Sequence, residues 1–117
     1  MKNTLFRSAG VLAAALLVAG TANAAGLLTA KNGMTIYVFD KDAGGVPTCY
    51  DACAVKWPPY LANKNEKMMK NWTEVKRTDG KLQWAYNAKP LYFFMGDKKK
   101  GDKTGDGVGG VWHAISE

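Results

Sequence analysis

The chain contains one short pattern twice at a fixed spacing, and this repetition constrains the fold more than any single motif. Residues 37–42 and 92–97 both read Tyr-x-Phe-x-x-Asp, which places the second copy at an offset of 55 from the first. The same offset pairs identical residues elsewhere, namely Asn32 with Asn87, Asp51 with Asp106, Trp57 with Trp112, Leu27 with Leu82 and Ala30 with Ala85. Chance rarely holds one spacing over so many positions, so the sequence indicates a duplicated module.

Strand and turn signals predict a mainly β domain built from two tandem β-hairpin repeats, at about 27–62 and 82–117. Asn32-Gly33 stands between two apolar runs, which is a strong hairpin signal. Both alternating faces of residues 34–39 are largely apolar, so this strand is expected to be covered on both sides. Further strands are expected at 72–77, 82–86, 91–95 and 111–115, with a short helix near the cysteines at 49–56.

We expect the two repeats to pack together with approximate internal two-fold symmetry. Each repeat alone has an unpaired strand edge and only half of a core, so neither is expected to be stable by itself. Residues 25–117 are therefore predicted to form a single β domain.

Residues 1–24 have the three parts of a secretory signal peptide. Lys2 and Arg7 supply positive charge, residues 9–19 form a short apolar run, and Ala22-Asn23-Ala24 has the small-x-small pattern of a cleavage site. We expect cleavage after Ala24 and a periplasmic or secreted protein. No later stretch is apolar enough over sufficient length to predict a transmembrane helix.

Residues 25–117 hold 14 Lys and Arg against 10 Asp and Glu, a net charge of +4. Part of the excess is local, because Lys98, Lys99, Lys100 and Lys103 occupy one predicted loop. The favoured interpretation is a solvated loop; a contact with anionic lipid or another acidic partner is the alternative. Nucleic acid is not expected as a partner of an exported protein.

Cys49 and Cys53 are the only cysteines of the chain. In an oxidising compartment, an isolated pair most often forms a disulfide. One helical turn between them would place their Cα atoms roughly 6 Å apart, which a disulfide accommodates. Closing so small a ring contributes about 2 kcal/mol on the loop-entropy model, so the bond is expected to fix one turn.

Together, these segments resemble a bacterial family of secreted repeats, also described as predicted lipoproteins with a Tyr-x-(Phe/Trp/Tyr)-x-x-Asp motif. Both copies match that motif, and residues 49–59 and 105–112 resemble the family's Cys-x-x-x-Cys…Trp-Pro-Pro and glycine-rich segments. The resemblance covers nearly all of residues 27–115. It implies an exported envelope protein whose biochemical role is not established, and it supplies no catalytic residues. Many members carry a lipobox cysteine, which this chain lacks, so a lipid anchor is not expected.

The repeated aromatic side chains have two interpretations. Tyr37 and Phe39 project from one face of a predicted strand, as do Tyr92 and Phe94 in the second copy. They could line a ligand groove, or they could pack in the core, where each buried ring contributes up to about 3 kcal/mol. Packing is the favoured interpretation.

The aspartates and tryptophans of the repeats are predicted to be structural. Asp42 and Asp97 end the two motifs, where a short acidic side chain can accept N–H bonds from the loop that follows. Trp57 and Trp112 occupy equivalent positions, so the two tryptophan segments are predicted to lie close together in space.

A metal or redox site would use Cys49, Cys53 and His113, the single histidine, with methionines as further candidate ligands. Soft ligands of this kind suit Cu(I). The proximity predicted for the tryptophan segments would bring His113 towards the cysteines. A structural disulfide with an ordinary exposed histidine is the favoured alternative.

The sequence supports no enzyme class. Ser116 is the only serine after residue 24 and His113 the only histidine, so a hydrolytic triad has no support. No phosphate-binding loop is present in the sequence. We therefore expect an exported, non-enzymatic binding or envelope-associated module without a cofactor. A copper-like metal-binding or redox accessory protein is the alternative, and the sequence identifies neither a partner nor an oligomeric state.

Overall fold

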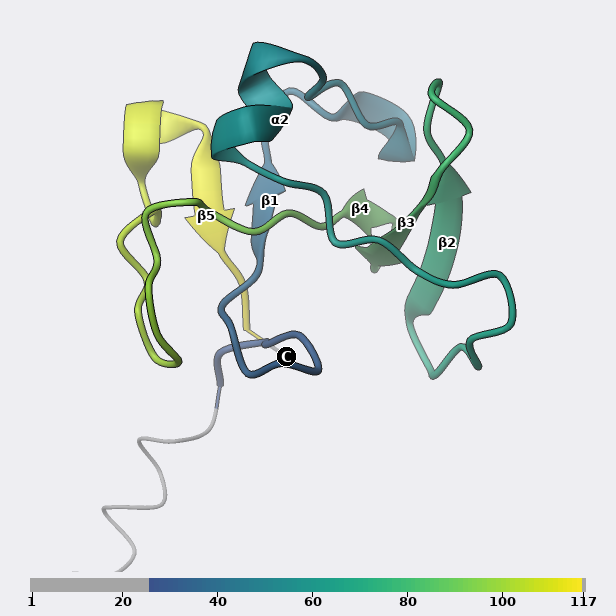
Figure 1. Ribbon diagram of the computed structural model, residues 1–117, viewed down its shortest axis with the longest axis horizontal. Coiled ribbons are helices and arrows are strands. Elements are labelled where there is room, and N and C mark those ends of the chain that lie inside the picture. The colour runs from purple at the N-terminus through teal and green to yellow at the C-terminus, as the bar shows by residue number, and fades with distance from the viewer. Residues whose placement is uncertain (1–25, 117) are drawn as a thin grey trace, which may run out of the picture.

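The computed structural model describes residues 26–116, and Figure 1 shows how they are arranged. The expected signal peptide and its cleavage site after Ala24 lie outside the described residues. The elements follow in the order β1 (Tyr37–Phe39), the 3₁₀ turn η2 (Ala43–Gly45), α2 (Ala52–Lys56), β2 (Trp72–Lys76), β3 (Leu82–Tyr86), β4 (Lys89–Pro90), the 3₁₀ turn η3 (Val108–Gly110) and β5 (Trp112–Ala114). The mainly β class predicted from the sequence is confirmed. Within residues 26–116, no helix is long and apolar enough to cross a membrane.

The strands form two small antiparallel sheets, and the smaller one joins the two repeats (Figure 1). β1 from the first copy pairs with β5 from the second, with Tyr37 opposite Ala114 and Phe39 opposite Trp112. The larger sheet has the order β2-β3-β4, and its first pair runs from Trp72 opposite Tyr86 to Lys76 opposite Leu82.

Backbone pairing around the two motif tyrosines has the symmetry that the repeat predicts. Tyr37 and Tyr92 form an antiparallel bridge, and each N–H donates to the other's carbonyl oxygen at 2.8 and 2.9 Å. Tyr37 also pairs with Ala114, and Tyr92 pairs with Pro59. Pro59 and Ala114 occupy equivalent positions, 55 residues apart. The pattern of strand pairing is therefore the same when the two copies are exchanged. Each motif tyrosine therefore pairs only with backbone from the other copy.

The two hairpins that begin the repeats differ in length by one residue. Thr29 bridges Thr35 in the first, whereas Ala85 pairs with Pro90 in the second. Equivalent residues are therefore 56 apart before the turn and 55 apart after it. The extra residue of the first turn makes two of the predicted equivalences wrong by one position, namely Leu27 with Leu82 and Ala30 with Ala85.

Several elements are shorter than the sequence predicts. β1 begins at Tyr37, and the strand expected at 91–95 is present only as the bridges of Tyr92, while β4 ends just before this range. The helix expected at 49–56 begins only at Ala52. Asp51 has φ 52° and ψ −123°, which lies outside the helical region, and this turn delays the start of the helix.

The β1 segment separates two apolar clusters, because successive side chains of a strand point to opposite faces. Ile36 and Val38 belong to one cluster, and Tyr37 and Phe39 belong to the other. The prediction that this strand is covered on both sides is therefore confirmed.

Candidate functional site

Each motif tyrosine donates a hydrogen bond to the aspartate of the other copy. The hydroxyl of Tyr37 donates to Oδ2 of Asp97 at 2.6 Å, and the hydroxyl of Tyr92 donates to Oδ2 of Asp42 at 2.7 Å. Both tyrosine side chains are completely buried. The motif therefore acts between the copies, since its tyrosine and its aspartate bond to the opposite copy.

The remaining oxygen of each aspartate holds the loop that follows it. Oδ1 of Asp42 accepts bonds from the N–H and hydroxyl of Thr48 at 2.8 and 2.6 Å. Oδ1 of Asp97 accepts the same pair of bonds from Thr104 at 2.9 and 2.6 Å. The loop-bonding role expected for both aspartates is present. Sequence reasoning missed the threonines because their spacing from the preceding aspartate differs between the two copies.

Four aromatic rings form one continuous stack between the copies, in the order Phe39, Trp112, Trp57 and Phe94. The centroid separations along the stack are 4.0, 3.8 and 4.2 Å, and the two indoles are parallel to within 1°. Tyr37 meets Trp57 edge-on at 5.4 Å, and Tyr92 meets Trp112 edge-on at 5.2 Å. Such pairs contribute about 0.5–1.5 kcal/mol each beyond burial. The structure brings the two tryptophan segments together as neighbours, and all six repeated rings lie in packing contacts.

Gly105 closes one side of this stack. Its N–H donates to the hydroxyl of Tyr37 at 3.2 Å. A Cβ at this position would lie 2.7 Å from a ring carbon of Trp57 and 2.9 Å from Phe94. Only glycine fits so close to the rings without displacing them.

Burial raises the pKa of Tyr37 and of Tyr92 well above the ordinary tyrosine value. The hydrogen bond from each phenol to a carboxylate raises the pKa further, because it stabilises the protonated phenol. Both phenols therefore remain hydrogen-bond donors at neutral pH, which suits a structural role.

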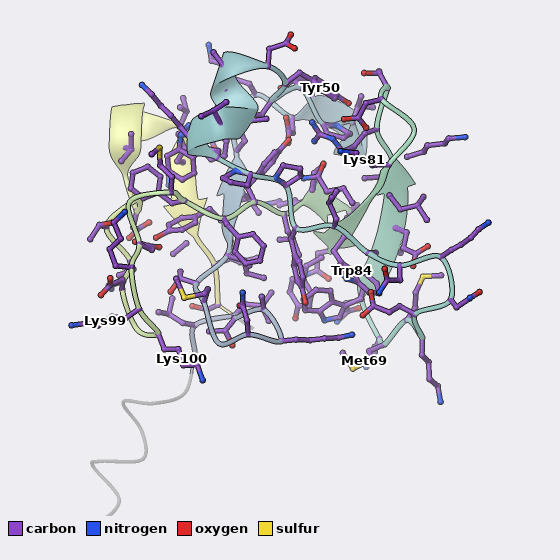
Figure 2. All side chains as sticks on the ribbon, viewed as in Figure 1. Tyr50, Met69, Lys81, Trp84, Lys99 and Lys100 are labelled. Atoms are coloured by element: carbon purple, nitrogen blue, oxygen red, sulfur yellow. A yellow bond between two sulfur atoms is a disulfide. The ribbon has the colours of Figure 1, made fainter. Side chains whose placement is uncertain are left out.

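Cys49 and Cys53 form a disulfide with a Cα–Cα distance of 5.3 Å, at the start of α2. The carbonyl oxygen of Cys49 accepts a bond at 2.9 Å from the buried guanidinium of Arg77. Arg77 also donates to Gln83 at 2.7 Å and lies 4.2 Å above the ring of Tyr50, which Figure 2 labels. Sequence reasoning missed Arg77 and Gln83, because no sequence pattern separates a buried polar residue from an exposed one in a short strand.

The residues considered for a metal site do not form a donor set. Both sulfurs are in the disulfide, and Nε2 of His113 lies 2.9 Å from Oδ2 of Asp40 at the surface. Among the residues that the structure describes, no group of three or more His, Cys, Asp or Glu side chains is placed to hold a metal ion.

A second group of aromatic side chains lies beside the larger sheet, and in this group Tyr60 and Trp72 are half-buried and Trp84 is buried. The ring of Tyr60 lies 6.3 Å from that of Trp72 and 6.4 Å from that of Trp84, and the two indoles are 5.6 Å apart. A hollow of about 150 Å³ lies against these three rings and is completed by Thr29, Ala30, Lys31, Lys67 and Met69. Figure 2 labels Trp84 and Met69 in this part of the molecule.

A larger hollow of about 460 Å³ adjoins the first, since both are lined by Ala30, Lys31 and Tyr60. We call the two hollows together the aromatic groove. Its floor is aromatic and its rim is basic. Lys31 pairs with Glu66, whereas the exposed Lys67 makes no ion pair within residues 26–116. The groove can accept a flat apolar group that carries a negative charge.

The aromatic groove was not predicted from the sequence. Tyr60 lies in an extended segment after Trp57, and Trp72 and Trp84 read as ordinary strand residues. A usable signal was nonetheless present: these three aromatics have no aromatic counterpart in the other copy at an offset of 55 or 56. Aromatic residues that only one copy carries mark a part of the structure that the two copies do not share.

The comparisons with known proteins agree with the repeat structure. A family model described as a secreted repeat of unknown function matches the chain twice, at residues 22–60 and 73–116. No curated protein and no solved structure matches the chain. The two matched segments contain both Tyr–Asp motifs and both stacked tryptophans. The chain therefore belongs to the Lipoprotein_15 family, the secreted repeat of unknown function.

Proposed function

We propose that the protein is an exported, non-enzymatic binding module and that the aromatic groove is its ligand site. The hollow that lies against Tyr60, Trp72 and Trp84 carries this proposal. Tyr60 and Trp72 are half-buried beside the hollow, and Trp84 lines it although it is only 4% exposed. Ligand pockets in proteins are typically concave, lined by apolar and aromatic side chains, and supplied with a few polar groups.

The chemistry of the groove favours a small anionic ligand with a flat apolar face. The indole and phenol rings offer surfaces on which such a face can stack. Lys67 supplies a free positive charge at the rim, and Lys31 shares its charge with Glu66. An acidic glycan unit or an aromatic acid has the required combination of an apolar face and a negative charge.

Two other parts of the proposal, that the protein is exported and that it is not an enzyme, are supported by different observations. The family is described as secreted, and the sequence of residues 1–24 has the pattern of a signal peptide. No catalytic constellation is recognisable in the sequence. A binding role accounts for the open groove and requires no catalytic residues.

A pair of matched probes tests the groove directly. We expect naphthalene-2-sulfonate, a flat anion, to bind oxidised protein of residues 25–117 more tightly than the neutral 2-naphthalenemethanol. In NMR titrations the indole N–H signals of Trp72 and Trp84 should shift, and those of Trp57 and Trp112 should not. Shifts confined to the stacked pair, or no saturable shift at all, would contradict the proposal.

Two substitutions separate the aromatic and the charged contributions. Lys67→Gln should weaken binding of the sulfonate several-fold and leave binding of the neutral probe unchanged. Trp72→Leu should weaken binding of both probes. Lys89→Gln, which removes an exposed charge from β4 outside the groove, is the matched control and should change neither affinity.

The intact mass of the native protein, isolated from the envelope, separates this proposal from the metal-binding alternative. A mass equal to residues 25–117 less two hydrogens is expected, because Cys49 and Cys53 are then oxidised and carry no ion. A protein with reduced cysteines and a bound metal would overturn the proposal and make Cys49, Cys53 and His113 the residues to substitute first.

A further inference from the structure

The net charge of the described protein is confined to three loops, at 30–34, 62–71 and 96–104. These loops hold eight lysines and three acidic residues, a balance of +5. The rest of residues 26–116 holds six basic and six acidic residues, a balance of zero. The excess positive charge of residues 26–116 therefore belongs to these three loops.

The three loops lie side by side along one edge of the molecule, at the bottom of Figure 1. The side chain of Lys100 lies across Gly33, where a Cβ would come within 2.8 Å of its carbons. The hydroxyl of Thr35 donates to the carbonyl oxygen of Asp102 at 2.7 Å, and Lys31 pairs with Glu66. The 30–34 turn therefore joins the other two loops, and we call the three together the basic edge. Figure 2 shows Lys99 and Lys100 at this edge.

The acidic residues of the basic edge are engaged by the protein itself. Asp97 accepts bonds from Tyr37 and Thr104. Oδ2 of Asp102 accepts bonds from the N–H groups of Lys98 and Lys99 at 2.9 and 3.2 Å. The lysines, in contrast, are all exposed, although Nζ of Lys98 also donates to the carbonyl oxygen of Met95 at 3.3 Å. Within residues 26–116, Lys31 is the only lysine of the edge in an ion pair, so seven ammonium groups remain available to an external anion.

Large apolar side chains accompany these charges. Met68 is 52% and Met69 is 64% exposed, and both lie in the 62–71 loop between Lys67 and Lys70. A soluble polyanion interacts favourably only with the positive charge. At a lipid interface, both the positive charge and the inserted apolar side chains contribute to binding. The combination of lysines and exposed methionines therefore favours a membrane over a free polyanion.

We propose that the basic edge docks on the surface of an anionic phospholipid bilayer, with lysines contacting headgroup phosphates and Met68 and Met69 reaching the interface. This contact is distinct from the ligand proposed for the aromatic groove, although Lys31, Lys67 and Met69 belong to both regions. It also reverses the interpretation favoured from the sequence, in which the lysines of 98–103 belonged to a solvated loop. The four lysines of residues 98–103 alone do not make a binding surface. The fold, however, brings eight lysines into three neighbouring loops, and the rest of residues 26–116 has no net charge.

Vesicle binding with matched triple variants tests the proposal. Wild-type protein should bind vesicles of phosphatidylglycerol and phosphatidylcholine, should bind pure phosphatidylcholine much more weakly, and should be released by added salt. The variant Lys70→Gln/Lys99→Gln/Lys100→Gln should lose about a hundredfold in affinity, since each lysine near such a surface contributes about fivefold. These three residues do not line the aromatic groove, so binding of naphthalene-2-sulfonate should persist.

The control Lys41→Gln/Lys56→Gln/Lys89→Gln removes the same charge from outside the basic edge and should retain most of the affinity. An equal loss in both triple variants would overturn the proposal, because it would show diffuse attraction to net charge. Absence of binding to the anionic vesicles would overturn it too. Equal affinity for soluble polyphosphate, together with no effect of Met68→Ser/Met69→Ser on vesicle binding, would replace the bilayer with a free polyanion.

Discussion

The hydroxyl of each motif tyrosine joins two segments that lie far apart in the sequence. The Tyr37 hydroxyl donates to Asp97 and accepts a bond from the N–H of Gly105. Asp97 in turn holds Thr104, so one phenol positions the whole loop after the second motif. Tyr92 and Asp42 do the same for the first copy through Thr48. Each Tyr-x-Phe-x-x-Asp motif therefore contributes its tyrosine to one hydrogen-bonded pair and its aspartate to another, and the partner in both pairs comes from the other copy.

Removing one hydroxyl should destabilise the protein more than the loss of a few atoms suggests. Tyr37→Phe leaves the carboxylate of Asp97, which is 8% exposed, without its phenolic donor. An unsatisfied buried acceptor costs roughly 1–3 kcal/mol, and Tyr92→Phe should cost a similar amount by symmetry. Urea unfolding measures both. Tyr86→Phe, at a half-buried position, is the control and should change the free energy of unfolding by less than about 0.5 kcal/mol.

The same phenols predict a loss of stability at alkaline pH. Tyrosine ionises near pH 10 in the unfolded chain, whereas the folded pKa of Tyr37 and of Tyr92 is raised. Above about pH 10 the unfolded state therefore binds fewer protons than the folded state, so the free energy of unfolding falls as pH rises. Urea unfolding between neutral pH and pH 11 should show this decline. A variant with both Tyr37→Phe and Tyr92→Phe should show a shallower one; an unchanged slope would mean that other groups cause it.

At the scale of elements, the disulfide is a local addition to the first copy. Cys49 follows Thr48 in the first copy at the position where Gly105 follows Thr104 in the second. The small ring that the Cys49–Cys53 disulfide closes constrains only the start of α2. The bonds from Thr48 to Asp42 and from Arg77 to the Cys49 carbonyl involve no sulfur atom. The second copy reaches the same arrangement with a glycine and a 3₁₀ turn.

The double variant Cys49→Ala/Cys53→Ala should therefore stay folded and lose about 2 kcal/mol of stability, the value for closing a small ring. Urea unfolding compared with oxidised and reduced wild type checks this figure. Complete unfolding on reduction would contradict it and would show that the disulfide constrains more than one turn.

The element scale also shows where sequence patterns reach their limit. Apolar alternation predicted the position of β1 between two clusters, because side-chain direction in a strand is a local property. The start of α2 depends on the turn at Asp51, and the offset shifts by one because of a longer hairpin turn at 30–34. Neither feature leaves a periodic signal. The hairpin, loop and tryptophan segments were predictable, whereas their exact lengths were not.

At the scale of the whole molecule, the two copies are intertwined and do not form two adjacent lobes. β1 pairs with β5 of the other copy, and Tyr92 pairs with Pro59. The central stack takes one Phe and one Trp from each copy. Each copy thus depends on strands and rings supplied from across the approximate two-fold axis.

Fragments cut within the exposed 62–71 loop should therefore fail to fold alone. We expect residues 25–64 and residues 65–117 to give the narrow NMR spectra of unfolded chains when each is isolated. Mixed in equal amounts under oxidising conditions, they should recover dispersed signals, because each then supplies the other's missing strand. A fragment that folds by itself would contradict the intertwined arrangement.

The same scale explains why the candidate sites were harder to predict than the repeat. Identity between copies marks residues that both copies need, which led to Tyr37, Tyr92 and the stacked rings. The aromatic rings of the groove and the lysines of the basic edge, such as Trp72 and Lys100, occur in only one copy. They become visible when the fold brings the 30–34, 62–71 and 96–104 loops together.

Double-mutant cycles give the most direct test of the central claim, that the motif acts between the copies. The cycle of Tyr37→Phe with Asp97→Ala, and that of Tyr92→Phe with Asp42→Ala, should each show a coupling of about 0.5–3 kcal/mol in urea unfolding. The cycle of Tyr37→Phe with Asp42→Ala, within one motif, should be additive to within about 0.5 kcal/mol. Coupling within a motif and additivity between the copies would contradict the account.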